Sequence, residues 1–246
     1  QLALIDFSGQ SEFAGANLSI KSKRVAGVGD QMVDVGAIDA SGIDLGKVNL
    51  KGDLGQIDAG SGGDKKPAVK SLKANSIGQH GIETQLPGGS VRSELMGALK
   101  KLNLSEGLHG AELHVSGKIG SITIKGDVSE SAIRGDNTMG AIKVLGNWTA
   151  SDLAAGVAAG NDGFFGTDDD TLIAGGTPLI SRIASILIKG AASGTEGGKD
   201  HFGFVAAQID AFKAAGTKQK LNRGASNDLE GLLVGATGDV TVRELV

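Results

Sequence analysis

A ten-residue segment occurs twice in the chain, with the second copy starting twenty residues after the first. The first copy, IGSITIKGDV, covers residues 119–128, and the second, MGAIKVLGNW, covers residues 139–148. Apolar residues occupy places one, four, six and ten of both copies, and Gly occupies places two and eight. Places four and six alternate as in a strand with one buried face, while Gly at place eight favours a turn with positive φ or a close backbone contact. Self-similarity at a fixed period is typical of a repeat architecture.

The same frame recurs along the rest of the chain. LGKVNLKGDL (45–54) fits at every place, and IASILIKGAA (183–192) fits in its central part. Weaker copies begin at Val35, Leu54, Val69, Met96, Gln208 and Thr237. A single copy cannot bury its inward side chains, whereas stacked copies bury them in a continuous core. The residues that we expect to point inward and to form columns are Val48, Leu50, Ile122, Ile124, Ile142, Val144, Ile186 and Ile188.

A unit of strand, glycine turn, second strand and second turn, about 20 residues long, is typical of one coil of a parallel β-helix. We therefore predict an all-β fold, a right-handed parallel β-helix whose coils stack about 4.8 Å apart. No shift in composition marks a boundary, so residues 1–246 are predicted to form a single domain. Loop insertions are expected near residues 60–68, 78–92, 149–180, 191–206 and 215–232.

Two segments also allow a helix. In VRSELMGALKKL (91–102), the residues Val91, Leu95, Leu99 and Leu102 fall on one helical face. FVAAQIDAFKAA (204–215) allows a second helix. Such helices would be short additions to a β scaffold, because a layered α/β fold needs longer helical stretches between its strands.

The composition restricts the functional classes. Gly accounts for 41 of the 246 residues, 3% of the chain is aromatic, and Tyr is absent, so the core is expected to consist of Ile, Leu, Val and Ala. The formal net charge of −4 gives no basic footprint for nucleic acid. The lack of Cys excludes disulfides and thiolate metal sites, and no apolar run reaches the ~18 residues of a membrane span. The chain begins with Gln1, which fits a mature exported form or a fragment of a longer chain.

One predicted loop has the composition of a cation site. AGNDGFFGTDDD (159–170) resembles the acidic D-G-x-x-G-T-x-D-D turn of bacterial extracellular repeat proteins. Ca²⁺ prefers six to eight oxygen ligands on a backbone bent by Gly. The predicted calcium ligands are Asn161, Asp162, Asp168, Asp169 and Asp170. The alternative is a solvated acidic turn. We also expect Phe164 or Phe165 to pack against the scaffold and anchor the loop.

The sequence offers no clear catalytic constellation. The four histidines are His80, His109, His114 and His201. If 109–114 were one extended strand, His109 and His114 would lie on opposite faces, so we expect no facing metal pair. The histidines are instead expected to be solvent-facing or locally hydrogen-bonded. The chain has no zinc motif, nucleophile elbow or P-loop.

Carbohydrate-active enzymes remain an alternative, because many β-helices cleave polysaccharides with acidic side chains brought together from successive coils. Asp39, Asp44, Asp53, Asp58 and Asp127 lie near predicted turns and could serve in this way. However, a chain without Tyr and with one Trp offers few sugar-stacking platforms. That residue, Trp148, falls at an apolar place of the frame and is predicted to be part of the core.

Through its repeated frame, over roughly half of its length, the chain resembles the Gly-rich β-helix repeats of large bacterial surface proteins, such as adhesins and autotransporter passengers. The resemblance implies an exported, extracellular or cell-surface protein with a structural or adhesive role rather than an enzyme. The final segment, TGDVTVRELV (237–246), reads as an uncapped last coil. We therefore expect end-to-end self-association into a filament or surface layer, with a surface polysaccharide as a further candidate partner.

Overall fold

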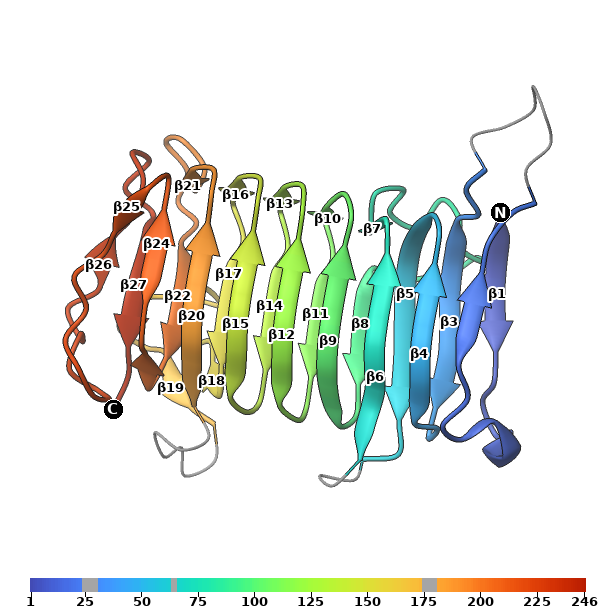
Figure 1. Ribbon diagram of the computed structural model, residues 1–246. Helices are drawn as coiled ribbons and strands as arrows, with labels where there is room; N and C mark the ends of the chain where they lie inside the picture. The colour runs from blue at the N-terminus through green and yellow to red at the C-terminus, as the bar shows by residue number, and fades with distance from the viewer. Residues whose placement is uncertain (24–30, 63–65, 174–180) are drawn as a thin grey trace.

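The protein is an all-β molecule built from two long sheets that run side by side along its length (Figure 1). The computed structural model describes residues 1–23, 31–62, 66–173 and 181–246. The only helix in these ranges is a single 3₁₀ turn, Ser11–Phe13. This architecture of long parallel sheets is compatible with the predicted β-helix.

Sheet A has 15 strands, and sheet B has ten. The strands of sheet A are β1 (Leu2–Asp6), β3 (Val35–Ser41), β5 (Asp53–Gly60), β7 (Ser76–Ile77), β8 (Arg92–Leu95), β10 (Leu108–His109), β11 (Glu112–Val115), β13 (Val128–Ser129), β14 (Ala132–Gly135), β16 (Trp148–Thr149), β17 (Asp152–Ala155), β21 (Ala192–Ser193), β22 (Phe202–Ala206), β26 (Leu232–Leu233) and β27 (Val240–Glu244).

The strands of sheet B are β2 (Leu18–Ile20), β4 (Leu45–Leu50), β6 (Pro67–Ala74), β9 (Ala98–Leu104), β12 (Ile119–Ile124), β15 (Met139–Val144), β20 (Arg182–Ile188), β23 (Gln208–Ile209), β24 (Phe212–Ala214) and β25 (Thr217–Lys218). A separate antiparallel pair consists of β18 (Val157–Ala158) and β19 (Thr171–Leu172).

The repeated frame of the sequence is the register of the sheets. Ile122 on β12 pairs in parallel with Ile142 on β15, and Val128 on β13 pairs with Trp148 on β16. On the next strand of each unit, β14 pairs with β17 at the same offset of 20 residues. Each unit therefore contributes one strand to each of three parallel rows, and the next unit lies directly beside it.

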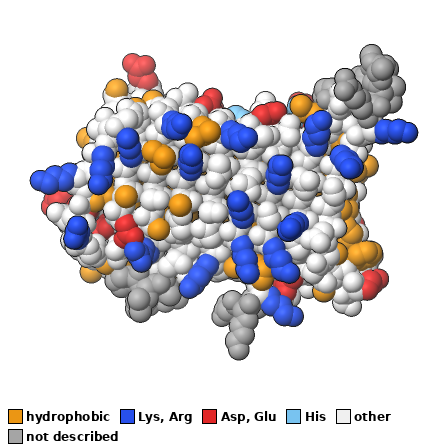
Figure 2. Space-filling view, viewed as in Figure 1, with side chains coloured by type: hydrophobic (Ala, Val, Ile, Leu, Met, Phe, Trp, Pro, Cys, Tyr) orange, Lys and Arg blue, Asp and Glu red, His pale blue; other side chains and the backbone are white. Residues whose placement is uncertain are grey.

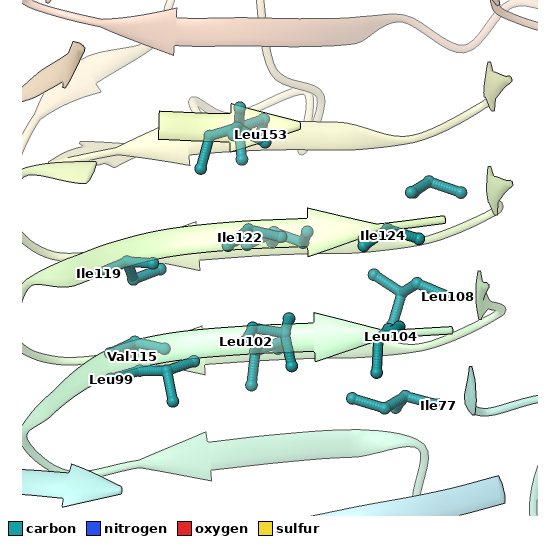
Figure 3. Close-up of a cluster of buried hydrophobic side chains, with 14 of the residues drawn as sticks. Ile77, Leu99, Leu102, Leu104, Leu108, Val115, Ile119, Ile122, Ile124 and Leu153 are labelled. Atoms are coloured by element: carbon teal, nitrogen blue, oxygen red, sulfur yellow. The ribbon is translucent and has the colours of Figure 1, made fainter. Parts of the chain in front are cut away.

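The core runs between the two sheets. Figure 3 shows Leu102, Leu104, Ile122 and Ile124 side by side on neighbouring strands. All eight residues predicted to point inward are at most 2% exposed, so the predicted columns are confirmed: Val48, Leu50, Ile122, Ile124, Ile142, Val144, Ile186 and Ile188. Trp148 is also completely buried, as predicted, and its ring packs 5.1 Å from that of Phe204.

The glycines at place eight allow close stacking of the backbone. Gly126 and Gly146 do not have positive φ. A Cβ atom on Gly126 would overlap the carbonyl oxygen of Glu106, and one on Gly146 would overlap that of Gly126. For Gly126 and Gly146, close backbone approach is therefore the one of the two expected reasons that applies.

The two helices allowed by the sequence do not form. Residues 91–102 contain β8 and the start of β9, and residues 204–215 contain parts of β22, β23 and β24. Leu95, Leu99 and Leu102 are buried as a helix would also require, so their spacing alone could not distinguish the two structures. Pairing of β9 with both β6 and β12 decides in favour of strands.

Several ranges predicted as insertions contain regular strands. β17 lies within 149–180, and β22 lies within 191–206; both continue the parallel ladder. Residues 78–91 are a loop, as predicted. The residues 63–65 and 174–180 of the predicted insertions lie outside the described ranges.

The two ends of the sheets differ. At the C-terminal end, β25 runs antiparallel to β24, and β26 runs antiparallel to β27. The expectation of an uncapped final coil is therefore wrong, because β27 pairs with β22 on one side and with β26 on the other.

At the N-terminal end, no described strand pairs with the outer edge of β1 or β2. Leu2 and Leu4 on β1 are 42% and 41% exposed.

Candidate functional site

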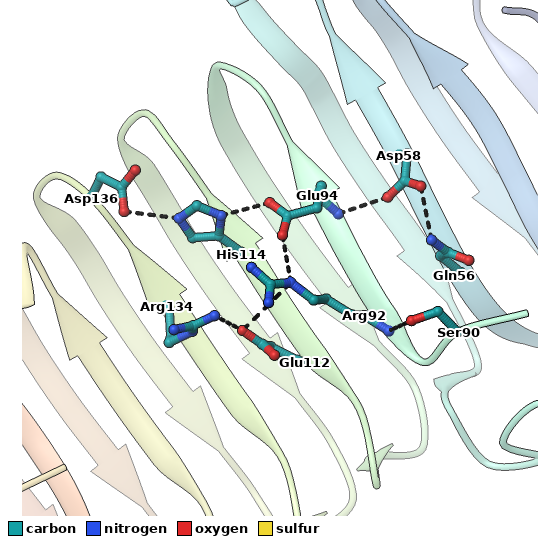
Figure 4. A network of polar contacts seen from close by, with 9 residues as sticks. All are labelled: Gln56, Asp58, Ser90, Arg92, Glu94, Glu112, His114, Arg134 and Asp136. Carbon is teal, nitrogen blue, oxygen red and sulfur yellow. Dashed lines mark hydrogen bonds and ion pairs between the residues drawn. The ribbon is translucent and has the colours of Figure 1, made fainter. Parts of the chain in front are cut away.

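The outer face of sheet A carries a cluster of charged side chains on neighbouring strands. Inward positions of β8, β11 and β14 are filled by buried apolar residues such as Leu95, Leu113 and Ile133. Because side chains alternate along a strand, the intervening positions point outward. The register places Glu94 beside His114 and Arg92 beside Glu112. We call this cluster the sheet A network; its members are Asp58, Arg92, Glu94, Glu112, His114, Arg134 and Asp136 (Figure 4).

His114 is the centre of the sheet A network. Its Nδ1 lies 2.6 Å from Oε2 of Glu94, and its Nε2 lies 2.8 Å from Oδ1 of Asp136. Burial by itself lowers the pKa of His114, but the hydrogen bonds to Asp136 and Glu94 outweigh burial and raise that pKa above its usual value. A ring that donates from both nitrogens to two carboxylates carries a positive charge.

The arginines of the network are paired as well. Nε of Arg92 lies 2.5 Å from Oε1 of Glu94 and 3.9 Å from Oε1 of Glu112. Arg134 forms an ion pair with the same Glu112. At the other end, Oδ1 of Asp58 accepts a hydrogen bond from the backbone N–H of Glu94 at 2.9 Å. The positive groups of the network are therefore all compensated by carboxylates, as Figure 4 shows.

A shallow groove of about 570 Å³ lies next to the network. Its lining includes Arg92, Glu112, Asp152, Asp200 and Phe202. The pKa of Asp152 is raised to about 7, chiefly by burial and to a smaller extent by the charge of Asp170. These effects outweigh a hydrogen bond from the Gly203 N–H at 2.8 Å and the charge of Arg134, which lower the pKa. A carboxyl group with such a pKa can donate or accept a proton near neutral pH.

The acidic loop lies against β17, β22 and β27. Phe165 is 5% exposed and packs with Ala154, Val205 and Leu245. The prediction that one of the two phenylalanines anchors the loop is therefore confirmed for Phe165. Thr241 on β27 adds a hydrogen bond from its hydroxyl to the carbonyl oxygen of Gly166 at 3.1 Å.

Two of the predicted calcium ligands hold the loop in its turn. Asp169 accepts hydrogen bonds from the backbone N–H groups of Asn161 at 2.6 Å and Asp162 at 3.3 Å. Its pKa is lowered chiefly by the hydroxyl of Thr167, 2.9 Å away. Asp162 accepts a hydrogen bond from the Phe164 N–H at 2.9 Å. These carboxylates act as turn acceptors in the structure described.

The other two predicted acidic ligands are Asp168 and Asp170. Asp168 is paired with Arg243 on β27 at 2.7 Å. Asp170 is 7% exposed; its Oδ2 accepts a hydrogen bond from the Gly166 N–H, while its Oδ1 has no partner. Burial raises the pKa of Asp170 to about 6. Within the described ranges, no three His, Asp or Glu side chains are placed to hold a metal ion together, and calcium binding stays a prediction.

The histidines are not gathered into one site. His109 ends β10 and its Nδ1 lies 2.9 Å from Oγ of Ser129, whereas His114 lies on β11. The chain turns between them at Gly110, where φ is +53°. The two residues therefore belong to different strands rather than to one extended segment. Their hydrogen-bond partners are not local, because Ser129 and Glu94 are each 20 residues away in sequence. Nε2 of His201 forms a hydrogen bond with the hydroxyl of Thr241, 3.0 Å away.

Most of the acidic residues considered for catalysis have structural partners at turns. Asp53 accepts a hydrogen bond from the Ser76 hydroxyl at 2.6 Å, and Asp44 accepts one from the Ser61 N–H at 2.9 Å. Asp39 likewise accepts a hydrogen bond from the backbone N–H of Ser41, and Asp127 accepts one from that of Asn147. Asp58 lies at the end of the sheet A network.

Sequence reasoning named His114 and Asp58 but missed that they belong to one network, and it missed Asp152. A signal was present, because His114 and Arg134 are 20 residues apart, as are Glu112 and Ala132, and the repeat places such pairs side by side. Glu94 to His114 has the same offset. Comparing outward positions at the repeat period would therefore have identified most of the cluster.

Comparison with models of known protein families, with curated proteins and with solved structures finds no match. The part of the chain that the structure describes contains no apolar helix of membrane-spanning length.

Proposed function

We propose that the chain is a right-handed parallel β-helix and that it serves as a structural protein outside the cell or on the cell surface, where it adheres or assembles end to end. The observation that supports this proposal best is the ladder itself. Parallel pairing runs from β2 to β24 in sheet B, and successive central strands keep the same offset of 20 residues. Repeats of this kind give extended bodies whose stability comes from contacts between neighbours.

The open end of the ladder supports self-association. The outer edges of β1 and β2 present backbone groups without a strand partner among the described residues, next to the exposed side chains of Leu2 and Leu4. Unpaired strand edges are templates for pairing with another chain. The C-terminal end presents fewer unpaired strand edges, because β25 pairs with β24 and β26 pairs with β27.

Electron microscopy and sedimentation of the purified protein test this proposal. We expect elongated particles that associate as concentration rises, and a Leu2→Lys/Leu4→Lys variant that remains monomeric with an unchanged circular dichroism spectrum. A matched variant at the other end, Leu233→Lys, should associate like the parent protein. A strictly monomeric parent at high concentration would rule out the self-assembling role.

The groove at Asp152 supports a second candidate function, cleavage of a polysaccharide. A carboxyl group with a pKa of about 7 beside Arg92 and Glu112 has the properties of a general acid. The test is incubation with acidic and neutral polysaccharides, followed by measurement of new reducing ends. Activity that is lost in Asp152→Asn and kept in Asp127→Asn would favour the enzyme; no product from any polysaccharide would leave the structural role.

A further inference from the structure

Positive and negative side chains are divided between the two sheets. The described strands of sheet B contain no Asp or Glu. They carry the exposed lysines Lys47, Lys70, Lys73, Lys100, Lys101, Lys143, Lys213 and Lys218. Figure 2 shows Lys and Arg side chains spread over this side of the molecule. We call these eight residues and the outward positions between them the lysine face.

Sheet A has the opposite balance of charge, because acidic residues outnumber basic ones on its strands. Its strands carry Asp6, Asp39, Asp53, Asp58, Glu94, Glu112, Asp152 and Glu244. Its three arginines, Arg92, Arg134 and Arg243, are all paired with carboxylates, and so is the charged His114. The net charge of −4 therefore conceals one strongly basic surface.

The lysines of this face are not compensated. Every ion pair among the described residues involves Arg or His, and no lysine of the face donates a side-chain hydrogen bond. Arg182, at the start of β20, differs because it is paired with Asp210. Uncompensated like charges repel each other, so an anion that binds across several of them gains attraction and removes this repulsion.

Most positions between the lysines carry small polar groups. One outward column of sheet B reads Lys47, Ser71, Lys101, Ser121, Ala141 and Ser185. The next reads Asn49, Lys73, Asn103, Thr123, Lys143, Leu187 and Lys213, so Ala141 and Leu187 are the apolar members of the two columns. Hydroxyl and amide groups donate and accept hydrogen bonds. The seven strands from β4 to β24 span about 30 Å at the usual strand spacing. The face thus offers charges and hydrogen-bonding groups in rows along the molecule.

We infer that the lysine face binds an anionic polysaccharide that lies across the strands of sheet B. The inference rests on the proposed extracellular role and identifies its partner. The carboxylate or sulfate groups of the polymer form ion pairs with the lysines, and its sugar hydroxyls form hydrogen bonds with Ser, Thr and Asn. A polymer that touches several lysines at once binds with the combined effect of individually weak contacts.

Two other polyanions fit the face less well. Single-stranded nucleic acid is bound through aromatic side chains on which bases stack, and the outward columns carry none. An anionic membrane is bound by a basic surface combined with large apolar side chains that enter the lipid. Leu187 is the only large apolar residue in the two outward columns.

The decisive experiment compares two double variants of equal charge. Lys73→Gln/Lys101→Gln removes two charges from the lysine face, and Lys199→Gln/Arg223→Gln removes two exposed charges outside the strands of sheet B. Binding to polygalacturonate and dextran sulfate is measured at low salt, with uncharged dextran as the control. Lys73→Arg/Lys101→Arg keeps the charge and serves as a conservative variant.

We expect binding to both polyanions, none to dextran, and a decrease in affinity as salt rises. The Lys73→Gln/Lys101→Gln variant should bind about tenfold more weakly, whereas the other two variants should bind like the parent. The inference is wrong if the parent binds neither polyanion, if both charge-removing variants weaken equally, or if duplex DNA or phosphatidylserine vesicles bind more tightly than the polysaccharides. Microscopy without polysaccharide is independent of these outcomes, so a failure here is distinguishable from a failure of the structural role.

Discussion

Ile124 on β12 lies beside Val144 on β15 in parallel register, and neither side chain is exposed to solvent. Leu104 on β9 occupies the same place on the other side of Ile124. The three residues are 20 positions apart in sequence and form one column of the core. Stability therefore depends on each column being filled without a break.

Replacing Ile124 with Asp should unfold the protein or lower its free energy of unfolding by several kcal/mol, about 4 or more, because an unpaired charge would be buried. Thr123→Asp is the matched control, since Thr123 is the adjacent residue and points outward. Circular dichroism during thermal unfolding measures both. A soluble Ile124→Asp variant with the parent's midpoint would contradict the register.

Phe165→Ala should release the acidic loop from sheet A. The ring is buried against Ala154 and Val205, and loss of such a contact costs about 3 kcal/mol. Limited proteolysis should then cut within residues 159–170 much faster than in the parent. Phe164→Ala, at the more exposed neighbouring residue, should leave the cleavage rate nearly unchanged. Equal rates in both variants would show that Phe165 is not the anchor.

The sequence was sufficient to predict the strands and the inward columns, because places four and six of the frame carry Ile, Leu or Val in nearly every copy. It did not decide between helix and strand at residues 91–102, since burial of Leu95, Leu99 and Leu102 suits both. Only pairing with β6 and β12, which is a tertiary effect, resolves that segment.

The site residues were harder to predict, for two physical reasons. The sheet A network depends on side chains that become neighbours only when units stack, as Glu94, His114 and Asp136 do. The raised pKa of Asp152 depends on burial, which no local pattern reveals. The lysine face was obscured by a different effect, because the net charge sums over both sheets.

The stability of the protein should depend on pH through His114. Its folded-state pKa is raised above 6.5 by Asp136 and Glu94, which outweigh burial. The stabilisation is therefore fully present below the unfolded-state pKa and is lost as pH rises through the folded-state pKa. Denaturant unfolding should show that His114→Gln costs about 1 kcal/mol at low pH and less at high pH. Asp136→Asn should weaken this pH dependence; a cost of His114→Gln that is constant with pH would contradict the prediction.

Calcium should raise the midpoint of thermal unfolding if the acidic loop binds it, because a ligand that binds only the folded state stabilises that state by mass action. The comparison uses the parent and an Asp162→Asn/Asp168→Asn variant, each with calcium and with a chelator. We expect calcium to stabilise the parent by a few degrees and the variant much less. Magnesium should have a smaller effect than calcium. Equal midpoints in all samples would leave the loop an ordinary acidic turn.

The central claim is that units of about 20 residues stack as neighbouring coils. The chain has no Cys, so spin labels attach only where Cys is introduced. Lys47, Lys101 and Ser185 lie in one outward column of sheet B, on β4, β9 and β20. Electron spin resonance should give narrow distances of about 24 Å between labels at 47 and 185, and about 14 Å between labels at 101 and 185, as five and three strand spacings require. Broad distributions, or distances that do not follow the number of strands between the labels, would contradict the stacked arrangement.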